Sequence, residues 1–285
     1  MSVLISVVMI TYNHENFIRE AIESVVMQKT NFDFELIIGE DCSRDRTRFI
    51  CEEYVQRYPK IVSLFPPQSN LGMMRNFART LKKANGEYIA ICEGDDYWTD
   101  PLKLQKQADF LRNNEKYAGV FHNVQAKYED GEKSPLLYCH FSKARSISFT
   151  DLSYSNTIPT CSVVFRSKYL NFLPSWFVNL AMGDWALHLF NSQYGDFWYI
   201  PQIMGVYRIT SSSSWAMQNQ IRNIQYVIET YDKMIRGFSE NPSLTRQLRK
   251  GRKRYVLRNR FLFFRILFRV LDKIYYYMQS RLKFL

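Results

Sequence analysis

The 285-residue sequence predicts an α/β fold, a mostly parallel sheet covered by helices on both faces. Through the first 125 residues, short apolar runs alternate with amphipathic stretches in the order that βαβ units require. The apolar runs are nearly continuous, as is typical of strands buried on both faces. With 46% hydrophobic residues, the chain is able to bury one large core, or one domain with an appendage.

The predicted elements follow from these runs. Strands are expected at 3–10, 34–39, 61–65, 87–92 and 118–125, and helices at 15–28, 45–58, 72–84 and 100–113. The pattern weakens after residue 126, where 127–158 is expected to form a hairpin or a loop excursion. Beyond it we expect strands at 160–165 and 198–207, a helix at 184–192, and a further helical segment from about Asn219.

Three clusters of polar residues directly follow predicted strands. They are Thr11-Tyr12-Asn13 after the first strand, Glu40-Asp41 after the second, and Glu93-Gly94-Asp95-Asp96 after the strand at 87–92. Ligands of open α/β sheets bind beyond the carboxyl ends of the strands. We therefore expect the three loops to converge on one crevice.

The acids at 93–96 are the strongest chemical signal. Three carboxylates within four positions repel one another unless a cation neutralises them. Oxygen ligands select a hard ion such as Mn²⁺ or Mg²⁺. A solvated loop or a helix start would also explain the acids, but their position beside two other polar strand ends favours a metal site.

The net charge of +11 is concentrated at one end of the chain. Residues 246–285 hold 13 Lys and Arg and a single acid, Asp272, whereas the rest of the chain is almost neutral. On a helical projection, the cations of 252–285 share one side and Phe, Leu and Ile occupy much of the remainder. We expect a helix that lies on an anionic membrane surface; a packed or self-associating basic helix remains an alternative, and no nucleic acid is expected.

The cysteines and the amino terminus suggest a compartment. Five widely spaced cysteines without a CxxC pair fit a reducing cytosol better than a disulfide framework. The first apolar run suits a buried strand better than a signal peptide, and no uncharged stretch is long enough to span a bilayer. The expectation is a cytoplasmic protein, peripheral on the cytoplasmic face of the membrane.

Three segments place the polar strand ends in one continuous order: ISVVMITYNHENFIREAIESVVMQ, FELIIGEDCSRDRT and NLGMMRNFARTLKKANGEYIAICEGDDYW. In order and spacing they resemble the nucleotide-binding half of the family 2 glycosyltransferases, which have the Rossmann-like GT-A fold. The resemblance is strong over 3–115 and looser over 116–210. It implies a glycosyltransferase domain at 1–218, with a nucleotide-binding half at 1–115 and an acceptor half at 116–218, followed by a basic helical extension at 219–285.

The resemblance implies a nucleotide-sugar donor, with UDP as the expected nucleotide. Thr11, Tyr12 and Asn13 would line the donor site, with Tyr12 stacking on the base. Asp41 would accept the base N–H, whereas the role of Glu40 stays open.

The acid cluster and the next helix would hold the rest of the donor. Asp95 resembles the residue that meets the ribose or the sugar, and Asp96 the ligand of a metal, Mn²⁺ or Mg²⁺, that bridges the diphosphate. Arg75 lies in the stretch that closes over the donor in relatives. A surface arginine explains Arg75 equally well.

Asp184 is the candidate base. The segment from Ala181 to Leu187 resembles the family's acid at the start of a helix in the acceptor half, and such an acid would take the proton of the acceptor hydroxyl. A structural helix cap is the alternative. The resemblance further implies inversion at the anomeric carbon and a glycan or lipid-linked acceptor of cell-envelope polysaccharide biosynthesis.

The chain departs from the family pattern in two ways. Relatives often carry a metal-binding histidine after a Tyr-Arg pair, but Tyr207-Arg208 is followed by Ile209-Thr210, and His14, His122, His140 and His188 lie elsewhere. The Gln-x-x-Arg-Trp signature of processive synthases is missing, which favours addition of one sugar per encounter.

Two other functions are alternatives. A membrane-associated protein that binds a nucleotide sugar without turnover would share most of these features; convergence of Asp96 and Asp184 would favour the enzyme. Nucleotidyl transfer would need a glycine-rich, basic loop after the first strand, which Thr11-Tyr12-Asn13 does not provide.

Overall fold

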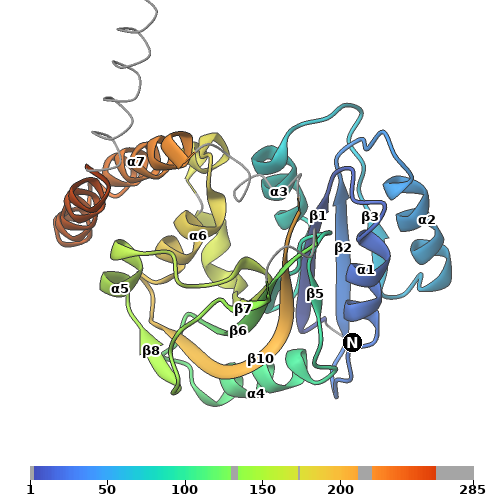
Figure 1. Ribbon diagram of the computed structural model, residues 1–285. Helices are drawn as coiled ribbons and strands as arrows, with labels where there is room; N and C mark the ends of the chain where they lie inside the picture. The colour runs from blue at the N-terminus through green and yellow to red at the C-terminus, as the bar shows by residue number, and fades with distance from the viewer. Residues whose placement is uncertain (1–2, 130–133, 173, 211–219, 261–285) are drawn as a thin grey trace, which may run out of the picture. The chain divides into compact units, whose positions relative to one another are not determined.

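The computed structural model describes residues 3–129, 134–172, 174–210 and 220–260 (Figure 1). The chain divides into two units, Met1–Met217 and Gln218–Leu285.

The first unit is built on a large sheet. In its described part the sheet has ten strands: β1 (Ile5–Thr11), β2 (Phe34–Glu40), β3 (Val62–Leu64), β4 (Tyr88–Ile91), β5 (Tyr97–Trp98), β6 (Gly119–Tyr128), β7 (Leu136–Leu137), β8 (Arg145–Ile147), β9 (Val164–Arg166) and β10 (Phe197–Ile209). Their order is β3-β2-β1-β4-β9-β6-β10-β5, with β7 paired to β6 and β8 to β10. The α/β fold expected from the sequence is confirmed.

The strand directions separate two halves of this sheet. β3, β2, β1 and β4 are parallel neighbours, as expected for consecutive βαβ units. β9 lies antiparallel between β4 and β6, and β10 then runs parallel to β6. The carboxyl ends of β1, β2 and β4 therefore meet at one edge.

Helices and short 3₁₀ turns surround the sheet. The helices are α1 (Ile18–Val26), α2 (Thr47–Arg57), α3 (Met73–Leu81), α4 (Lys103–Asn113), α5 (Phe149–Tyr154) and α6 (Gly183–Asn191), and the turns are η1 (Thr160–Ser162), η2 (Ser167–Phe172) and η3 (Ser175–Asn179). One hydrophobic cluster joins the buried faces of α1, α2 and α4 to β1, β2 and β4. Figure 1 shows α1 and α2 beside β1, β2 and β3.

The alternation of side chains along β1 explains the two faces. Ile5, Val7 and Met9 are fully buried in the cluster with α1, α2 and α4. Val8 points to the opposite face and is also fully buried. Because both faces of β1 are buried, its sequence is an almost continuous apolar run.

The second half of the first unit differs in detail from the sequence prediction. The strand expected at 160–165 is replaced by the turn η1 followed by β9, and the segment 127–158 contains α5 besides two short strands. Ser148 and Asp151 form a capping box that starts α5. This Ser-x-x-Asp signal was available in the sequence.

The second unit contains two described helices, α7 (Gln220–Gly237) and a helix over residues 242–260. Pro242 occupies the first helical position, where its missing N–H costs nothing. Asp232 of α7 accepts two hydrogen bonds from Arg252, at 2.7 and 3.1 Å, and the Tyr231 and Tyr255 rings lie 6.2 Å apart. The two helices therefore pack on each other.

The membrane-facing helix expected from the sequence extends beyond residue 260, outside the described residues. Of the helices that the structure describes, none combines the length and the apolar character needed to cross a bilayer.

Candidate functional site

The loops after β1, β2 and β4 do come together. Asp41 N–H donates to the carbonyl of Thr11 (3.0 Å), and Gly94 N–H donates to that of Ile10 (3.0 Å). A Cβ at Gly94 would lie 2.6 Å from Thr11 Oγ1. Glycine at 94 is therefore what allows the acid loop to pack directly on the end of β1.

Asp96 is the most enclosed acid of this loop. Its side chain is 1% exposed, and Oδ1 accepts the backbone N–H of Arg208 at 2.8 Å. Oδ2 is buried and has no hydrogen-bond partner among the described residues. A buried carboxylate oxygen without a donor is costly unless a cation or a ligand reaches it.

The acids of both halves of the first unit interact electrostatically. The pKa of Asp96 is raised well above its usual value by burial and by the charge of Asp95, against the opposing effect of the Arg208 N–H. Burial and the charges of Asp96, Asp95 and Asp184 raise the pKa of Glu93 in the same way. Asp184 is therefore close to the acid loop, although 88 positions separate it from Asp96.

Asp184 is held by side chains rather than by its own helix. α6 begins at Gly183, its N-cap is Met182, and no side chain caps its end. The Asp184 carboxylate instead accepts hydrogen bonds from Asn156 Nδ2 (2.8 Å) and Thr160 Oγ1 (3.3 Å). The helix-cap explanation therefore does not describe this carboxylate.

Arg208 organises the acid loop, a role that the sequence did not predict for it. It is 4% exposed, and besides the N–H bonded to Asp96 its guanidinium donates to the carbonyl of Asp95 (2.9 Å). Nε donates to Glu129 (2.9 Å), and Nη2 pairs with Glu20. Its charge therefore lies beside the acids.

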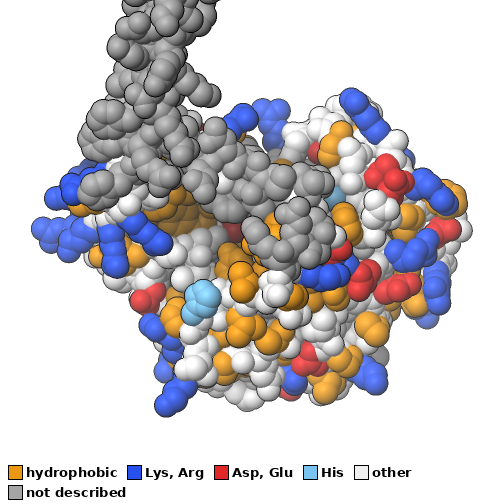
Figure 2. Space-filling view, viewed as in Figure 1, with side chains coloured by type: hydrophobic (Ala, Val, Ile, Leu, Met, Phe, Trp, Pro, Cys, Tyr) orange, Lys and Arg blue, Asp and Glu red, His pale blue; other side chains and the backbone are white. Residues whose placement is uncertain are grey.

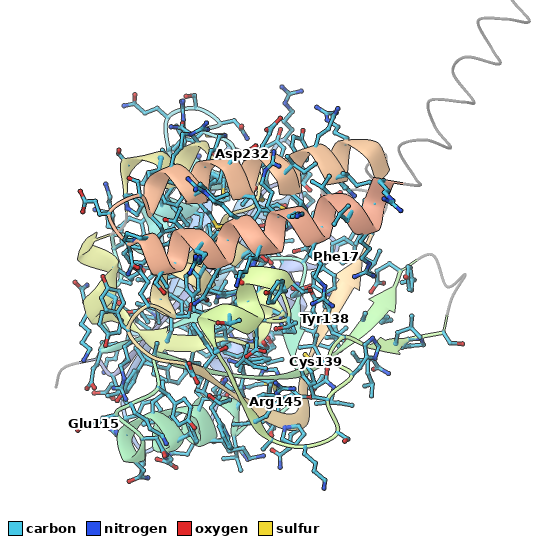
Figure 3. The ribbon with its side chains drawn as sticks, turned by 90° about the vertical axis from the view of Figure 1, so that its left-hand side faces the viewer. Phe17, Glu115, Tyr138, Cys139, Arg145 and Asp232 are labelled. Carbon is cyan, nitrogen blue, oxygen red and sulfur yellow. The ribbon has the colours of Figure 1, made fainter. Side chains whose placement is uncertain are left out.

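Two tyrosines also border the acids and were missed. Tyr138 follows β7 (Figure 3), and its ring meets that of Tyr207 edge to face at 5.9 Å. Burial, followed by the charges of Asp184 and other groups, raises the pKa of Tyr138. Burial and the charges of Asp96 and Glu93 raise that of Tyr207. The Tyr-Arg pair marked the position of Tyr207 in the sequence but not its place beside the acids, and no local motif distinguishes Tyr138.

Some hydrogen bonds of the loop after β1 stabilise the conformation of the loop itself. Asn13 has a left-handed backbone (φ 55°), its side chain accepts the N–H of Arg44 at 2.9 Å, and its own N–H donates to Ser43. Tyr12 is 37% exposed. An exposed aromatic ring beside an ordered loop is available for stacking.

Asp41 and Glu40 are both buried at the end of β2. The Asp41 carboxylate accepts the N–H groups of Leu71 (2.8 Å) and Gly72 (2.9 Å) and so fixes the start of α3. Glu40 Oε1 accepts the N–H of Ser43 at 2.6 Å. Arg75 is exposed on the first turn of α3.

One of the four histidines, none of which follows the Tyr-Arg pair, lies at the acid loop. His14 Nε2 is 3.9 Å from Asp95 Oδ2. It reaches the acids from the loop after β1, not from the position after Tyr207-Arg208. Spatial proximity across the sheet could not be read from its place in the sequence.

The acid cluster fits a divalent cation that takes few ligands from the protein. Within the described ranges, no three His, Cys, Asp or Glu side chains form a group that could hold a metal by itself. Mg²⁺ in particular is often held by one or two carboxylates, with substrate phosphates and water as the other ligands. Asp96, with its unpartnered Oδ2, is the residue that would hold such an ion.

Comparison with known sequences identifies relatives. Residues 6–172 match the family described as "Glycosyl transferase family 2". An uncharacterized protein of Mycobacterium tuberculosis is 40% identical over 213 residues, which cover 74% of this chain and 60% of that protein. The dTDP-rhamnosyl transferase RfbG of Shigella flexneri is 30% identical over 204 residues, which cover 67% of this chain and 68% of that protein. The chain thus spans 60% of the length of the mycobacterial relative.

Solved structures share the fold at low identity. S. aureus TarS in complex with UDP-GlcNAc superimposes with a TM-score of 0.58 and 18% identity, over 89% of this chain and 80% of that one. The mannosyltransferase PcManGT of Pyrobaculum calidifontis, in complex with GDP-Man and Mn²⁺, gives a TM-score of 0.61 and 15% identity, over 88% and 74% of the two chains. With the matched segment covering more than half of its residues, the chain belongs to glycosyl transferase family 2.

Proposed function

We propose that residues 1–218 transfer one sugar from a nucleotide-sugar donor, a UDP-sugar, to the hydroxyl of a glycan or lipid-linked acceptor in cell-envelope polysaccharide synthesis. The observation that supports this most is the convergence of Asp96 and Asp184. The two acids come from different halves of the unit, and the charge of Asp184 acts on the loop that carries Asp96. A crevice that only held a nucleotide would not need the second acid.

In the proposed reaction Asp184 takes the proton of the acceptor hydroxyl. The freed oxygen attacks the anomeric carbon, and the bond to the nucleoside diphosphate breaks with inversion. Asn156 and Thr160 orient the Asp184 carboxylate, which leaves its Oδ1 without a described hydrogen bond. A divalent cation held by Asp96, when bound, would neutralise the charge that develops on the departing diphosphate.

The donor would be bound at the strand ends. Tyr12 would stack on the base, and Asp41 would accept the base N–H in addition to the two backbone N–H groups that it already holds. Thr11, Asn13, Asp95 and Arg75 complete the proposed donor set. RfbG is named a dTDP-rhamnosyl transferase, whereas TarS was solved with UDP-GlcNAc and PcManGT with GDP-Man, so UDP rests on the sequence resemblance.

A screen of nucleotide sugars tests this function. UDP-, GDP- and dTDP-sugars are incubated with the full chain with Mn²⁺, with Mg²⁺ and with excess chelator, and melting temperature and nucleotide release are recorded. We expect one nucleotide class to raise the melting temperature and to be hydrolysed slowly in the presence of a metal only. Stabilisation without any turnover on a panel of acceptors would favour the binding protein, and the absence of both would refute the proposal.

We further propose that the second unit holds the protein on the cytoplasmic face of an anionic membrane. Within the described residues, Arg246, Arg249, Lys250 and Lys253 are exposed on one side of the helix at 242–260. Figure 2 shows Lys and Arg side chains gathered over this helix. The five basic residues beyond Arg260 lie outside the described residues and would extend the same surface.

The membrane test follows from the packing of the two helices. Truncation after Leu248 would cut the helix at 242–260 before Arg252, which pairs with Asp232. Truncation after Arg260 and the triple variant Arg249→Glu, Lys250→Glu, Lys253→Glu are therefore the better probes. Each cation near an anionic surface contributes on the order of 1 kcal/mol, so the triple variant should partition to anionic vesicles at least about 100-fold less well.

The matched control is Lys29→Glu, Lys60→Glu, Lys82→Glu, which changes the net charge equally at exposed sites of the first unit. It should sediment with vesicles like the parent, and high salt should release the parent. Equal binding of both triple variants, or binding indifferent to lipid charge, would refute the membrane role.

A further inference from the structure

The ring of His14 connects two of the strand-end loops. Nδ1 lies 3.2 Å from Thr11 Oγ1, and Nε2 lies 3.9 Å from Asp95 Oδ2. The side chains of His14 and Asp95 are 19% and 22% exposed, so a ligand is able to reach both. Neither the sequence pattern nor the proposed reaction uses this histidine.

The surroundings fix the position of His14. Its N–H donates to Thr47 Oγ1 (2.7 Å), and its carbonyl accepts the N–H groups of Phe17 (2.9 Å) and Ile18 (2.8 Å). A Cβ at Gly94 would lie 3.1 Å from Nδ1, so the ring rests on the acid loop. His14 is therefore held at the end of β1 in the way that a binding residue requires.

These contacts also select one tautomer. A proton on Nδ1 would leave Nε2 as an acceptor facing the Asp95 carboxylate, which is itself an acceptor. The Thr11 hydroxyl is able to donate to Nδ1, and Nε2 then carries the proton and faces Asp95 as a donor. The arrangement thus presents one donor and one acceptor side by side.

The separation of the pair suits a single hydroxyl group. At 3.9 Å, Nε2 and Oδ2 are too far apart for a direct hydrogen bond. For an oxygen placed about 2.8 Å from both atoms, the angle Nε2–O–Oδ2 is about 90°. A hydroxyl at this point is able to accept from Nε2–H and to donate to the carboxylate at once.

We propose that His14 is a further donor-binding residue, which together with Asp95 holds one ribose hydroxyl of the nucleotide sugar. This rests on the proposed function, in which Asp95 belongs to the donor-binding set. The consequence is a substrate class: the site selects a ribonucleoside diphosphate over the deoxynucleotide that lacks that hydroxyl. In a complex with the deoxynucleotide, the carboxylate and the imidazole would each lack the hydrogen bond that the hydroxyl provides. The deoxynucleotide should therefore bind more weakly than the ribonucleotide.

The test compares nucleotides that differ by one oxygen. Binding of UDP and GDP and of their 2′-deoxy and 3′-deoxy forms is measured calorimetrically with Mg²⁺ for the full chain and for His14→Ala and His14→Gln. The parent should bind the better ribonucleotide about 10-fold more tightly than one of its deoxy forms. His14→Ala should reduce that ratio to about 2 or less, and His14→Gln, whose amide also donates, should restore a ratio of about 5.

Three results distinguish a failure of this inference from a failure of the proposed function. If the parent binds UDP or GDP but does not distinguish the deoxy forms, or if His14→Ala keeps the full ratio, this inference is wrong and the proposed function stands. If the parent binds no nucleotide, the proposed function fails as well. Arg48→Ala, on the exposed side of α2, is the control and should keep the parent's ratio.

Discussion

Replacing Asp96 by asparagine is expected to abolish sugar transfer, with a loss of about 10³-fold or more, because the buried Oδ2 that would hold the cation is lost. Folding should survive. Asn retains an oxygen for the Arg208 N–H, and a neutral side chain removes both the cost of burying a charge and the repulsion by Asp95, the two causes that raise the pKa of Asp96. The melting temperature should therefore equal or exceed that of the parent. Turnover and thermal unfolding of the purified variant measure both expectations.

The pKa of Asp96 adds a pH dependence to this prediction. Because that pKa is raised, protons compete with the cation well above the usual range of a carboxyl group. Metal affinity, followed by Mn²⁺ titration, should rise as the pH rises through the raised pKa. Asp109→Asn, an exposed acid on α4, is the control and should leave turnover and metal affinity unchanged. Full activity of Asp96→Asn would remove Asp96 from the site.

Asp184→Asn is expected to lower kcat for sugar transfer by about 10²- to 10⁴-fold, because a positioned base contributes roughly that much. Donor affinity should change less than about 2-fold, since the base acts on the acceptor. The variant keeps an oxygen that is able to accept from Asn156, so the local structure should persist. Steady-state transfer with the acceptor found in the screen, together with calorimetric donor binding, separates the two quantities.

Asp151→Asn is a matched control for Asp184, because Asp151 stands in the first turn of α5 and belongs to a capping box. It should cost some stability and leave kcat unchanged. If Asp184→Asn behaves in the same way, or loses donor affinity in parallel with kcat, Asp184 is a structural acid.

The first 125 residues were predictable because local rules govern them. Continuous apolar runs such as Val7–Met9 are found in strands buried on both faces, and polar residues follow where those strands end. The predicted strands and helices up to Gln125 are all present, with ends shifted by up to three residues. The short strand β5 was not predicted, because two residues are too few to show the alternation of apolar and polar side chains that marks a strand.

The second half was less predictable because its elements depend on distant partners. β9 has three residues and lies antiparallel between β4 and β6, so neither its extent nor its direction follows from its own sequence. Asn156 and Thr160 could not be predicted for the same reason. They contact Asp184 only in the folded chain, across 28 and 24 positions of the sequence.

By itself, the sequence determined the α/β class and the family, and it singled out the acids at 93–96 and 184 as candidates, because these follow from periodicity and from short motifs with a fixed order. The tertiary structure alone decided which side chains surround those acids. Arg208 reaches Asp95 and Asp96 across more than 100 positions, and His14 meets Asp95 from another strand end. Hydrogen bonds and charge interactions act over a few ångströms of space regardless of separation along the chain, so the composition of this site is settled only when the sheet brings its strand ends together.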